Sequence, residues 1–278
     1  MTELYQDVIA LLTDFGLRGS HYVASMKGVI LKINPNVKIV DIAHMVSPYS
    51  IIEASYLIKS SYRYFPEYTV FILVIDPGVG SSRNILALET ESHYYFVGPD
   101  NGLFPNILFE DEIEECVIVN NENYFVEPVS QTFHGRDIMA PVGAYITNGI
   151  PLPNFGSYFN PKKFVHYPIK YELKPKEHII ECTIQYVDSF GNITTNIPIK
   201  DNLIRDTEIE LYEGKSIIFS ANNKEIKGIY ASHFADVPKK NLLFLKGSSN
   251  FLEISINQGN AAENLNVSIG DIIIIDLK

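Results

Sequence analysis

Short apolar runs alternate with amphipathic segments over the first 83 residues of the chain. The runs predict strands, and the run before Asp76 is a continuous series of apolar, β-branched and aromatic residues, which predicts a strand buried on both faces. The segments between them carry apolar residues at helical spacing, and Ser20 is expected to cap the first helix. Strands that alternate with helices predict a parallel sheet with right-handed crossovers. The predicted strands are 8–13, 37–42 and 69–76, and the predicted helices are 20–31 and 50–64.

The pattern changes after Arg83, where two neighbouring apolar runs predict a hairpin and a further strand follows. A helical pattern comes next and ends at Asn148 and Gly149. Five prolines between residues 151 and 175 then indicate an interdomain linker. The predicted elements are a hairpin of 84–90 with 93–97, a strand at 114–119 and a helix from about residue 138.

Beyond this linker the sequence has no convincing helical pattern. Short apolar runs alternate with turn residues, which is typical of a small all-β barrel or sandwich. We therefore expect an α/β protein with two domains, a Rossmann-like α/β domain at residues 1–165 and a small all-β barrel domain at residues 166–278. The expected strands of the second domain lie near 178–187, 193–197, 208–212, 216–219, 225–230, 242–246, 251–256 and 271–277.

Composition narrows the class of protein. The 278 residues are 46% hydrophobic, which is enough to bury a core. The net charge of −11 argues against a nucleic-acid or anionic-membrane binder, whose surface would be basic. Neither a signal peptide nor an apolar run of the ~20 residues that span a bilayer is visible. Cys116 and Cys182 each lie in an apolar run, which indicates buried free thiols, and the whole pattern predicts a cytoplasmic protein.

Two acidic residues end predicted buried strands. Asp76 is followed by a proline and two glycines that let the chain bend sharply, and Asp14 ends the first strand. Open α/β sheets bind ligands at the carboxyl ends of their strands, so both acids are candidates for a site, although Asp14 also suits a turn or a helix cap. Gly78 and Gly80 begin a dinucleotide-binding pattern, but Arg83 stands in place of its third glycine, which disfavours a phosphate loop.

His134 precedes a glycine and a predicted helix, whose N-terminus favours an anion or a polarised water. A single histidine is more often structural than catalytic, and Asp137 is expected to cap or complement the same helix. A dinuclear metal hydrolase uses acids and histidines of this kind, but none of them shows a local metal-ligand spacing, so a metal site is kept as the alternative. Its candidate ligands are Asp14, His44, Asp76 and His134.

The densest polar segment of the second half is 188–196, whose composition predicts a hairpin turn. Phe190 and Asn192 within it would also suit a nucleobase. The ring of Phe190 would stack on the base, and the amide of Asn192 would hydrogen-bond its edge. Two later loops, 247–250 and 257–262, are rich in hydrogen-bond donors. They fit recognition of a ligand as well as plain turns.

Six segments together resemble the S-adenosyl-L-methionine (SAM) hydroxide adenosyltransferase family. Its members are adenosine-forming SAM hydrolases related to the SAM-dependent fluorinase and chlorinase. Each segment alone is a weak signal, whereas six in order over nearly the whole chain are specific. The segments are LLTDFG (11–16), VIDPGVGSSR (74–83), GPDNGL (98–103), FHGRD (133–137), DSFGNITTN (188–196) and QGNAAE (258–263).

The resemblance implies a homotrimer that binds SAM between the N-terminal α/β domain of one subunit and the C-terminal β-barrel of its neighbour. It also implies that Asp76, Arg83 and His134 act on a water beside C5′ of SAM. The halogenases lack this set, and the short stretch between Asp76 and His134 leaves little room for the extra loop of the fluorinase. Hydrolysis to adenosine and L-methionine is therefore expected, with SAM as the substrate and with no separate cofactor or metal.

The remaining contacts implied by the resemblance involve both domains. Asp14 matches the acid that binds the ribose hydroxyls. Ser249 matches a serine near the methionine carboxylate, but Asn250 stands where the halogenases have arginine, which leaves the pairing of that carboxylate open. The contacts to the methionine portion and the adenine match Asp188, Phe190, Asn192, Asn260 and Ala261.

The expected reaction is an in-line displacement by water. Asp76 and His134 are both candidates for accepting the proton of the water, and Arg83 would stabilise its developing hydroxide character. The alternatives are a halogenase-like enzyme, a SAM- or adenosine-binding protein without turnover, and a metal-dependent nucleotide hydrolase. The complete set of three residues favours the hydrolase.

Overall fold

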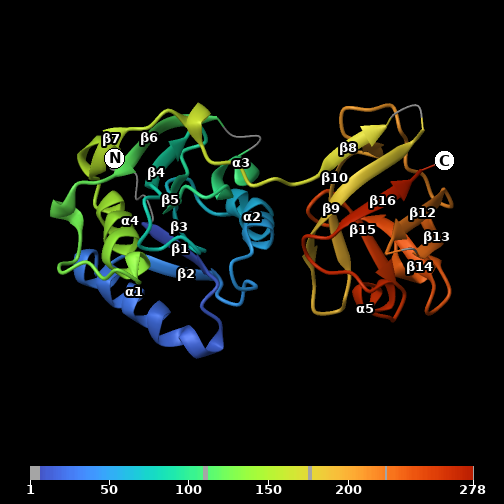
Figure 1. Cartoon of the computed structure of the whole chain (residues 1–278), viewed down its shortest axis with the longest axis horizontal. Helices are drawn as coiled ribbons and strands as arrows, with labels where there is room; N and C mark the ends of the chain where they lie inside the picture. The colour runs from blue at the N-terminus through green and yellow to red at the C-terminus, as the bar shows by residue number, and fades with distance from the viewer. Residues whose placement is uncertain (1–6, 109–111, 175–176, 223, 278) are drawn as a thin grey trace. The chain divides into compact units, whose positions relative to one another are not determined.

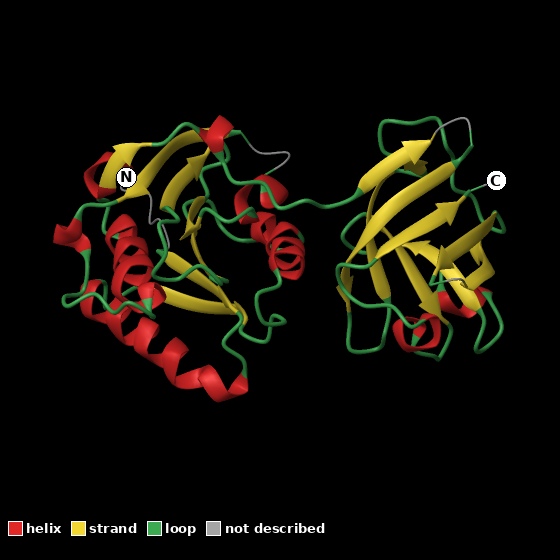
Figure 2. Cartoon of the chain, viewed as in Figure 1, coloured by secondary structure: helices red, strands yellow, loops and turns green. Residues whose placement is uncertain are grey.

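The computed structural model describes residues 7–108, 112–174, 177–222 and 224–277, and the chain forms two compact units (Figure 1). The first unit is Met1–Tyr167 and the second is Pro168–Lys278. Helices and strands are mixed in the first unit, whereas strands dominate the second (Figure 2). The expected fold class, an α/β domain followed by a β-barrel, is confirmed.

The first unit is built on a mixed seven-stranded sheet. Its strands are β1 (Val8–Thr13), β2 (Lys38–Ala43), β3 (Val70–Val74), β4 (Ile85–Thr90), β5 (Tyr95–Pro99), β6 (Ile113–Val119) and β7 (Gly156–Tyr158). They lie in the order β2-β1-β3-β5-β4-β6-β7. The parallel pairing expected for the first three strands and the hairpin of β4 with β5 are both confirmed. Its helices are α1 (Ser20–Ile33), α2 (Ile51–Lys59), α3 (Leu103–Ile107) and α4 (Ala140–Thr147).

Alternate residues of β1 face two separate hydrophobic cores. Ile9 and Leu11 belong to the core that α1 and α4 cover, and Ala10 and Leu12 belong to the core under α2 and α3. Figure 1 shows these two pairs of helices on opposite faces of the sheet. A strand that is covered on both faces is apolar at every position, which explains the uninterrupted apolar runs in the sequence.

The two longest helices of the first unit begin differently. The prediction that Ser20 caps α1 is wrong, because its backbone is already helical and Gly19 is the residue before the helix. At α2 the Ser50 hydroxyl does accept the backbone N–H of Glu53, at 3.3 Å. α2 is shorter than the predicted range 50–64, and a separate turn of 3₁₀ helix ends that range.

Much of the predicted linker packs onto the first unit. β7 pairs with β6, and Phe155, Phe159 and Phe164 are buried. The expectation of a linker is therefore wrong for residues 151–164, and it is also wrong for Tyr171–Lys174, which form a strand of the second unit, β8. Prolines stop a helix from continuing, but they do not prevent the aromatic residues between them from filling a core.

Seven strands of the second unit close into a barrel in the order β9-β10-β15-β14-β13-β12-β16, because β16 pairs with β9 and β9 pairs with β10. Two strands extend the sheet beyond this ring. The strands of the ring are β9 (Ile179–Val187), β10 (Ile193–Lys200), β12 (Ser216–Ala221), β13 (Lys224–Tyr230), β14 (Leu242–Lys246), β15 (Phe251–Ile256) and β16 (Ile272–Asp276), and those beyond it are β8 (Tyr171–Lys174) and β11 (Leu203–Ile204).

The isoleucine run in β16 shows how the barrel is filled. Ile273 and Ile275 are fully buried, whereas Ile272 and Ile274 lie on the outer face. Strand periodicity therefore sends alternate residues of this run into the core.

Two features of the second unit differ from the predictions. The expected strand at 208–212 is reduced to a single bridge between Glu210 and Leu203. A short helix, α5 (Ala261–Leu265), was not expected; the Asn260 side chain caps it by accepting the N–H of Glu263 at 2.9 Å. Five residues are too few for a recognisable helical period.

Single helical turns connect the longer elements. In the described ranges, no helix combines the length and the apolar character that crossing a membrane requires. The turns of 3₁₀ helix are Leu17–Gly19, Tyr62–Tyr64, Glu122–Tyr124, Leu152–Phe155, Pro161–Lys163 and Phe234–Asp236, and Gly135–Met139 is a turn of π-helix.

Candidate active site

Candidate groups gather at the carboxyl ends of β1 and β3. Thr13 pairs with Val74 in parallel register, so the residues after the two strands leave the sheet at the same edge. Asp14 and Asp76 consequently line one cavity of about 330 Å³, although they are far apart in the sequence. The polar and aromatic residues of its lining include Asp14, Tyr49, Asp76, Thr132, Phe133 and His134.

The loop after β3 folds back on itself. Two successive turns form it, since the N–H of Val79 bonds to the carbonyl of Asp76 and that of Ser81 bonds to Gly78. This brings Arg83 Nε to 2.7 Å from Asp76 Oδ1, and a second guanidinium nitrogen contacts Oδ2. The side chains are 11% and 6% exposed, so the expectation that Arg83 turns inward to face Asp76 is confirmed.

His134 joins this ion pair from the segment before α4. Its Nδ1 lies 3.0 Å from a guanidinium nitrogen of Arg83. Burial of the ring lowers the pKa of His134 below its usual 6.5, and the charge of Arg83 lowers it further, while Asp76 and Asp137 act in the opposite direction. The ring is therefore neutral at pH 7.

The contact with Arg83 also selects the tautomer of His134. A guanidinium has donors only, so Nδ1 must accept this hydrogen bond. A neutral ring that accepts at Nδ1 carries its proton on Nε2. Within this arrangement His134 has an N–H to offer, whereas Asp76 has carboxylate lone pairs.

Asp14 is a partly buried carboxylate in the same cavity. Its Oδ2 accepts the backbone N–H of Tyr49 at 2.8 Å, which ties the loop after β1 to the loop after β2. Burial raises the pKa of Asp14 and the nearby charge of Asp76 adds to this, while the hydrogen bond from Tyr49 opposes it. A ligand that donates hydrogen bonds, such as a pair of sugar hydroxyls, would stabilise the ionised form of this carboxylate.

His44 is directed to other partners than the candidate catalytic residues. Its Nδ1 lies 3.0 Å from Thr13 Oγ1, and its Nε2 lies 3.0 Å from Asp41 Oδ1. The ranges that the structure describes contain no group of three or more acidic, histidine or cysteine side chains placed to hold a metal ion. The four candidate metal ligands of the sequence analysis therefore do not form one cluster.

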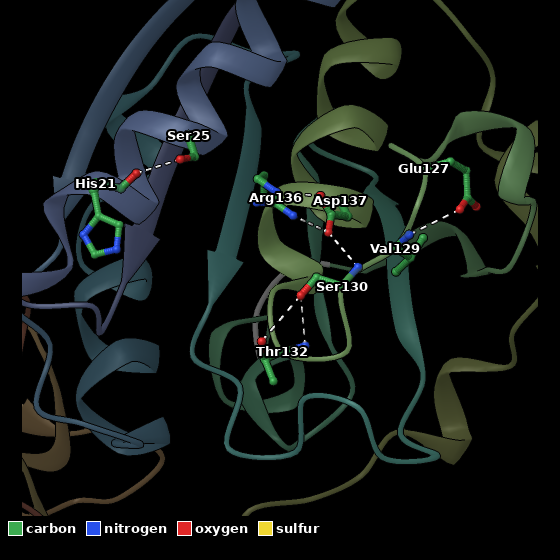
Figure 3. Close-up of polar contacts among 8 residues, drawn as sticks. All are labelled: His21, Ser25, Glu127, Val129, Ser130, Thr132, Arg136 and Asp137. Carbon is green, nitrogen blue, oxygen red and sulfur yellow. Dashed lines mark hydrogen bonds and ion pairs between the residues drawn. The ribbon is translucent and has the colours of Figure 1, made fainter.

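A buried carboxylate organises the segment that carries His134 (Figure 3). Asp137 is fully buried and accepts the backbone N–H of Ser130 at 2.9 Å and two hydrogen bonds from Arg136, at 2.6 and 2.9 Å. The Ser130 hydroxyl in turn accepts the N–H of Thr132 at 3.3 Å. Asp137 lies in the first turn of its helix, where an acid that complements the helix dipole is expected, and its bond to Ser130 of the preceding segment is a role that the sequence does not indicate.

An aromatic wall of the cavity was also missed. The rings of Phe15 and Phe133 meet edge to face at 5.7 Å, and Tyr22 of α1 contacts both rings. Phe15 and Phe133 each stand beside a residue that the motifs singled out, Asp14 and His134. A polar residue at the end of a buried strand is conspicuous, whereas an adjacent phenylalanine has the same appearance as a core residue.

The candidate residues of the barrel form a second group, at one end of that unit. Asp188 Oδ1 accepts the N–H groups of Phe190 and Asn192, both at 2.9 Å, and Oδ2 accepts the Asn192 side-chain amide at 2.9 Å. The ring of Phe190 is 75% exposed. The same loop packs against Asn260, because a Cβ on Gly191 would overlap the Asn260 side chain.

The other barrel candidates are placed by backbone contacts. Ala261 is fully buried in the first turn of α5, so any contact it makes with a ligand would be through its backbone. Ser249 belongs to a turn closed by the N–H of Asn250 and the carbonyl of Gly247, at 3.0 Å. The structure thus groups Asp188, Phe190, Asn192, Asn260 and Ala261, and it places Ser249 in a separate turn of the same unit.

Comparison with known proteins agrees with both units. The N-terminal domain of SAM hydroxide adenosyltransferases matches residues 9–156, and the C-terminal domain matches residues 182–274. A protein of Methanocaldococcus jannaschii named (R)-S-adenosyl-L-methionine hydrolase is 37% identical over 274 residues, 95% of this chain and 94% of that protein. A fluorinase of Nocardia brasiliensis is 28% identical over 213 residues, 68% of this chain and 71% of that protein.

A solved structure supports the same relationship. The crystal structure of an uncharacterized conserved protein from Thermotoga maritima superposes with a TM-score of 0.86 and 36% identity, covering 96% of this chain and 99% of that chain. The matches include both domain types in order and extend over almost the whole sequence. The chain belongs to the SAM hydroxide adenosyltransferase family.

Proposed function

We propose that this protein hydrolyses SAM by attack of water at C5′ and releases adenosine and L-methionine. The observation that carries the proposal is the contact of Asp76, Arg83 and His134 at a cavity that also contains Asp14. The family and its relatives named as SAM hydrolases agree with this chemistry. SAM is the substrate, and the proposal includes no cofactor.

The leaving group of the proposed reaction needs no catalytic acid. The sulfur of SAM is a sulfonium, so methionine leaves as a neutral thioether and no acid is required. Water is a weak nucleophile, because it must lose a proton as it attacks C5′. A group that accepts this proton typically contributes ~10²–10⁴-fold to the rate.

We assign the proton to Asp76, directly or through a relay. Nδ1 of His134 is occupied by Arg83, so the neutral ring offers the water an N–H from Nε2 and not a lone pair. Asp76 has lone pairs in addition to those that face Arg83. In this arrangement His134 orients the water, and Arg83 stabilises both the carboxylate and the developing hydroxide.

Substrate binding draws on both units in this proposal. Asp14 accepts hydrogen bonds from the ribose hydroxyls. The exposed ring of Phe190 provides a surface on which the adenine stacks. The remaining contacts to adenine and methionine are assigned to Asp188, Asn192, Ser249, Asn260 and Ala261.

We further propose that the protein is a homotrimer in which the α/β unit of one subunit and the barrel of its neighbour complete each site. Closure of two surfaces over SAM would exclude bulk water and fix the in-line geometry. A cytoplasmic location is part of the proposal. Cys116 and Cys182 are both free and buried, as expected for a protein of a reducing compartment.

Incubation of the protein with SAM in ¹⁸O-labelled water tests the reaction. The label is expected in the 5′-oxygen of adenosine, together with one methionine for each adenosine, in the presence of a chelator. A 5′-chloro nucleoside formed in chloride would indicate a halogenase, and loss of turnover on chelation would indicate a metal-dependent enzyme. Intact SAM that stays bound would indicate a binding protein.

Variants at the proposed catalytic residues separate chemistry from binding. Arg83→Ala and His134→Ala are each expected to lower kcat by ~10²-fold or more, since each removes a group that acts on the water. The Kd for adenosine is expected to change little. Equal losses in turnover and in adenosine affinity would make the two residues binding elements instead.

A further inference from the structure

Two loops meet at the candidate site. The second has little regular secondary structure, so other contacts have to fix its position. The loop after β3 carries Arg83, and the segment 129–134 before α4 carries His134. They touch closely, because a Cβ on Gly80 would lie 2.7 Å from the carbonyl oxygen of Gln131. A displacement of segment 129–134 would therefore move both His134 and the loop that holds Arg83.

The N–H of Val129 is held by Glu127 at 3.2 Å, and further bonds that fix this segment lead to Asp137. Its carboxylate holds the N–H of Ser130, and the Ser130 hydroxyl holds the N–H of Thr132, whose side chain lines the cavity (Figure 3). The carbonyl of Asp137 accepts the N–H of Val126 at 2.8 Å, which fixes the beginning of the same connection. Asp137 thus anchors the stretch before α4 at two places, Val126 and Ser130.

Arg136 extends this anchor to the aromatic wall. Its guanidinium makes both bonds to Asp137 and also lies over the ring of Phe133, 5.1 Å from the ring centre. Phe133 lines the cavity next to His134. The pair of Arg136 and Asp137 therefore holds the residues on both sides of the turn that presents His134.

The backbone between His134 and Asp137 is unusual as well. Gly135–Met139 forms a turn of π-helix, a feature that is rare and often found at functional sites. Gly135 packs so closely against β3 that a Cβ would lie 2.9 Å from the side chain of Val74. The π-turn brings the Asp137 carboxylate under the preceding segment while His134 remains at the cavity.

We infer that Asp137 is a positioning residue of the reaction, which holds segment 129–134 so that His134 meets Arg83 at the water site. The inference rests on the proposed function. Asp137 is fully buried and is not among the residues that line the cavity. Its effect passes through Ser130, Arg136 and the π-turn.

Asp137→Asn is the direct test. Asparagine retains an acceptor for the N–H of Ser130, but its amide then turns a donor toward the donors of Arg136. Arg136 is 37% exposed and is free to swing into solvent, which releases Phe133. We expect kcat to fall about tenfold to a hundredfold, the loss typical of a misplaced catalytic group, with KM and the Kd for adenosine within twofold of wild type.

Two further variants exclude a merely structural effect. Ser130→Ala removes the two contacts of the Ser130 hydroxyl with Thr132, to its N–H at 3.3 Å and to its hydroxyl at 3.4 Å, and is expected to lower kcat severalfold without lowering Tm. Asp100 is another buried carboxylate that accepts a backbone N–H, from Val165 at 3.0 Å, and it does not line the cavity. Asp100→Asn is therefore the matched control and is expected to retain the wild-type kcat.

The outcomes distinguish a failure of the proposed function from a failure of the positioning role of Asp137. A wild-type protein that makes no adenosine from SAM refutes the proposed function itself. An active wild type with unchanged kcat in folded Asp137→Asn refutes the positioning role alone. The role is also refuted if the loss of activity follows the unfolded fraction, measured by circular dichroism at the assay temperature.

Discussion

Arg83 contacts both of the other candidate catalytic side chains. It faces Asp76 with two nitrogens and also donates to His134. One cation therefore pairs with the carboxylate and makes protonation of the ring less favourable. In the proposed reaction the carboxylate of Asp76 is then the proton acceptor and the ring of His134 is the hydrogen-bond donor.

The first prediction concerns the pH dependence of turnover. The pKa of His134 is lowered by burial and by Arg83, so the ring stays neutral when the pH falls to 6.5, the usual histidine value. We expect kcat/KM to hold through pH 6.5 and to fall only at a more acid pH, where protonation breaks the bond from Arg83. The groups that face the ring are Asp76, Arg83 and Asp137, with Asp14 in the same cavity.

The lowered pKa of His134 also makes the stability of the fold depend on pH, and the stability falls toward acid pH. Between pH 6.5 and the lower pKa of the folded state, the unfolded chain binds a proton at His134 more readily than the folded chain does. The contribution of His134 is thus complete above pH 6.5 and is lost as the pH falls through the lower pKa. NMR titration of the ring checks both statements, and a pKa at or above 6.5 would contradict them.

The second prediction concerns Asp14, whose pKa is raised by burial and by Asp76. The folded state holds this proton more tightly than the unfolded state, so stability falls as the pH rises from 3.8 through the raised pKa. Asp14→Asn removes this cost and retains an acceptor for the Tyr49 N–H. We expect a higher Tm than wild type at pH 7, no difference below pH 4, and weaker binding of adenosine.

Thermal unfolding at the two pH values, with adenosine titration by calorimetry, measures both effects. A residue that serves stability alone would lower Tm when replaced and leave adenosine binding unchanged. That outcome would remove Asp14 from the proposed site.

At the scale of elements, the site depends on the edge where β1 and β3 end. The parallel register aligns Thr13 with Val74, and the two acids follow from it. The loop after β3 then has to bend back within a few residues, and it does so against the segment before α4. Glycine is required where the two connections touch.

The third prediction compares two glycines in the left-handed region. Gly80 has φ +78° and Gly149 has φ +79°, but a Cβ on Gly80 would lie 2.7 Å from the carbonyl oxygen of Gln131, whereas a Cβ on Gly149 would meet nothing within 4 Å. Gly149→Ala is expected to lower the free energy of unfolding by about 1 kcal/mol through backbone strain alone. Gly80→Ala is expected to cost more and to lower kcat.

Urea unfolding and steady-state kinetics of the two variants measure this difference. Gly149→Ala is the control, because it has the same backbone strain at the end of α4 and no contact with the cavity. Equal losses of stability and full activity in both variants would show that the contact with Gln131 is unimportant.

At the scale of the whole molecule, the candidate residues are divided between the two units. The proposed catalytic residues and Asp14 belong to the first unit, and the proposed contacts to adenine and methionine belong to the barrel. The proposed homotrimer brings the two sets together from different subunits. Complementation between inactive variants tests this directly.

The fourth prediction is that His134→Ala and Asp188→Ala subunits restore activity when they are mixed. A site of a mixed ring is intact only if its α/β unit comes from an Asp188→Ala subunit and its barrel comes from a His134→Ala subunit, which at equal amounts holds for about a quarter of the sites. We expect about a quarter of the wild-type kcat after joint refolding. Activity no greater than the mean of the two separate variants would place each site within a single subunit.

Much of the fold was predictable because its signals are local. The uninterrupted apolar runs indicated strands covered on both faces, and β1 and β3 are such strands. The alternation of short strands and turns indicated the barrel. The linker prediction failed over residues 151–164 because proline content reports where helices stop and does not report which side chains become buried.

The sequence by itself determined most of the strands, the two acids at the ends of β1 and β3 and the order of the six family segments, since each depends on residues close together in the chain. Only the tertiary structure decided that Asp14 and Asp76 share one cavity, that Arg83 reaches His134 and that Asp137 holds Ser130. These contacts join segments through strand register and side-chain packing. Neither leaves a periodic signal in the sequence, because each depends on which elements become neighbours in the folded protein.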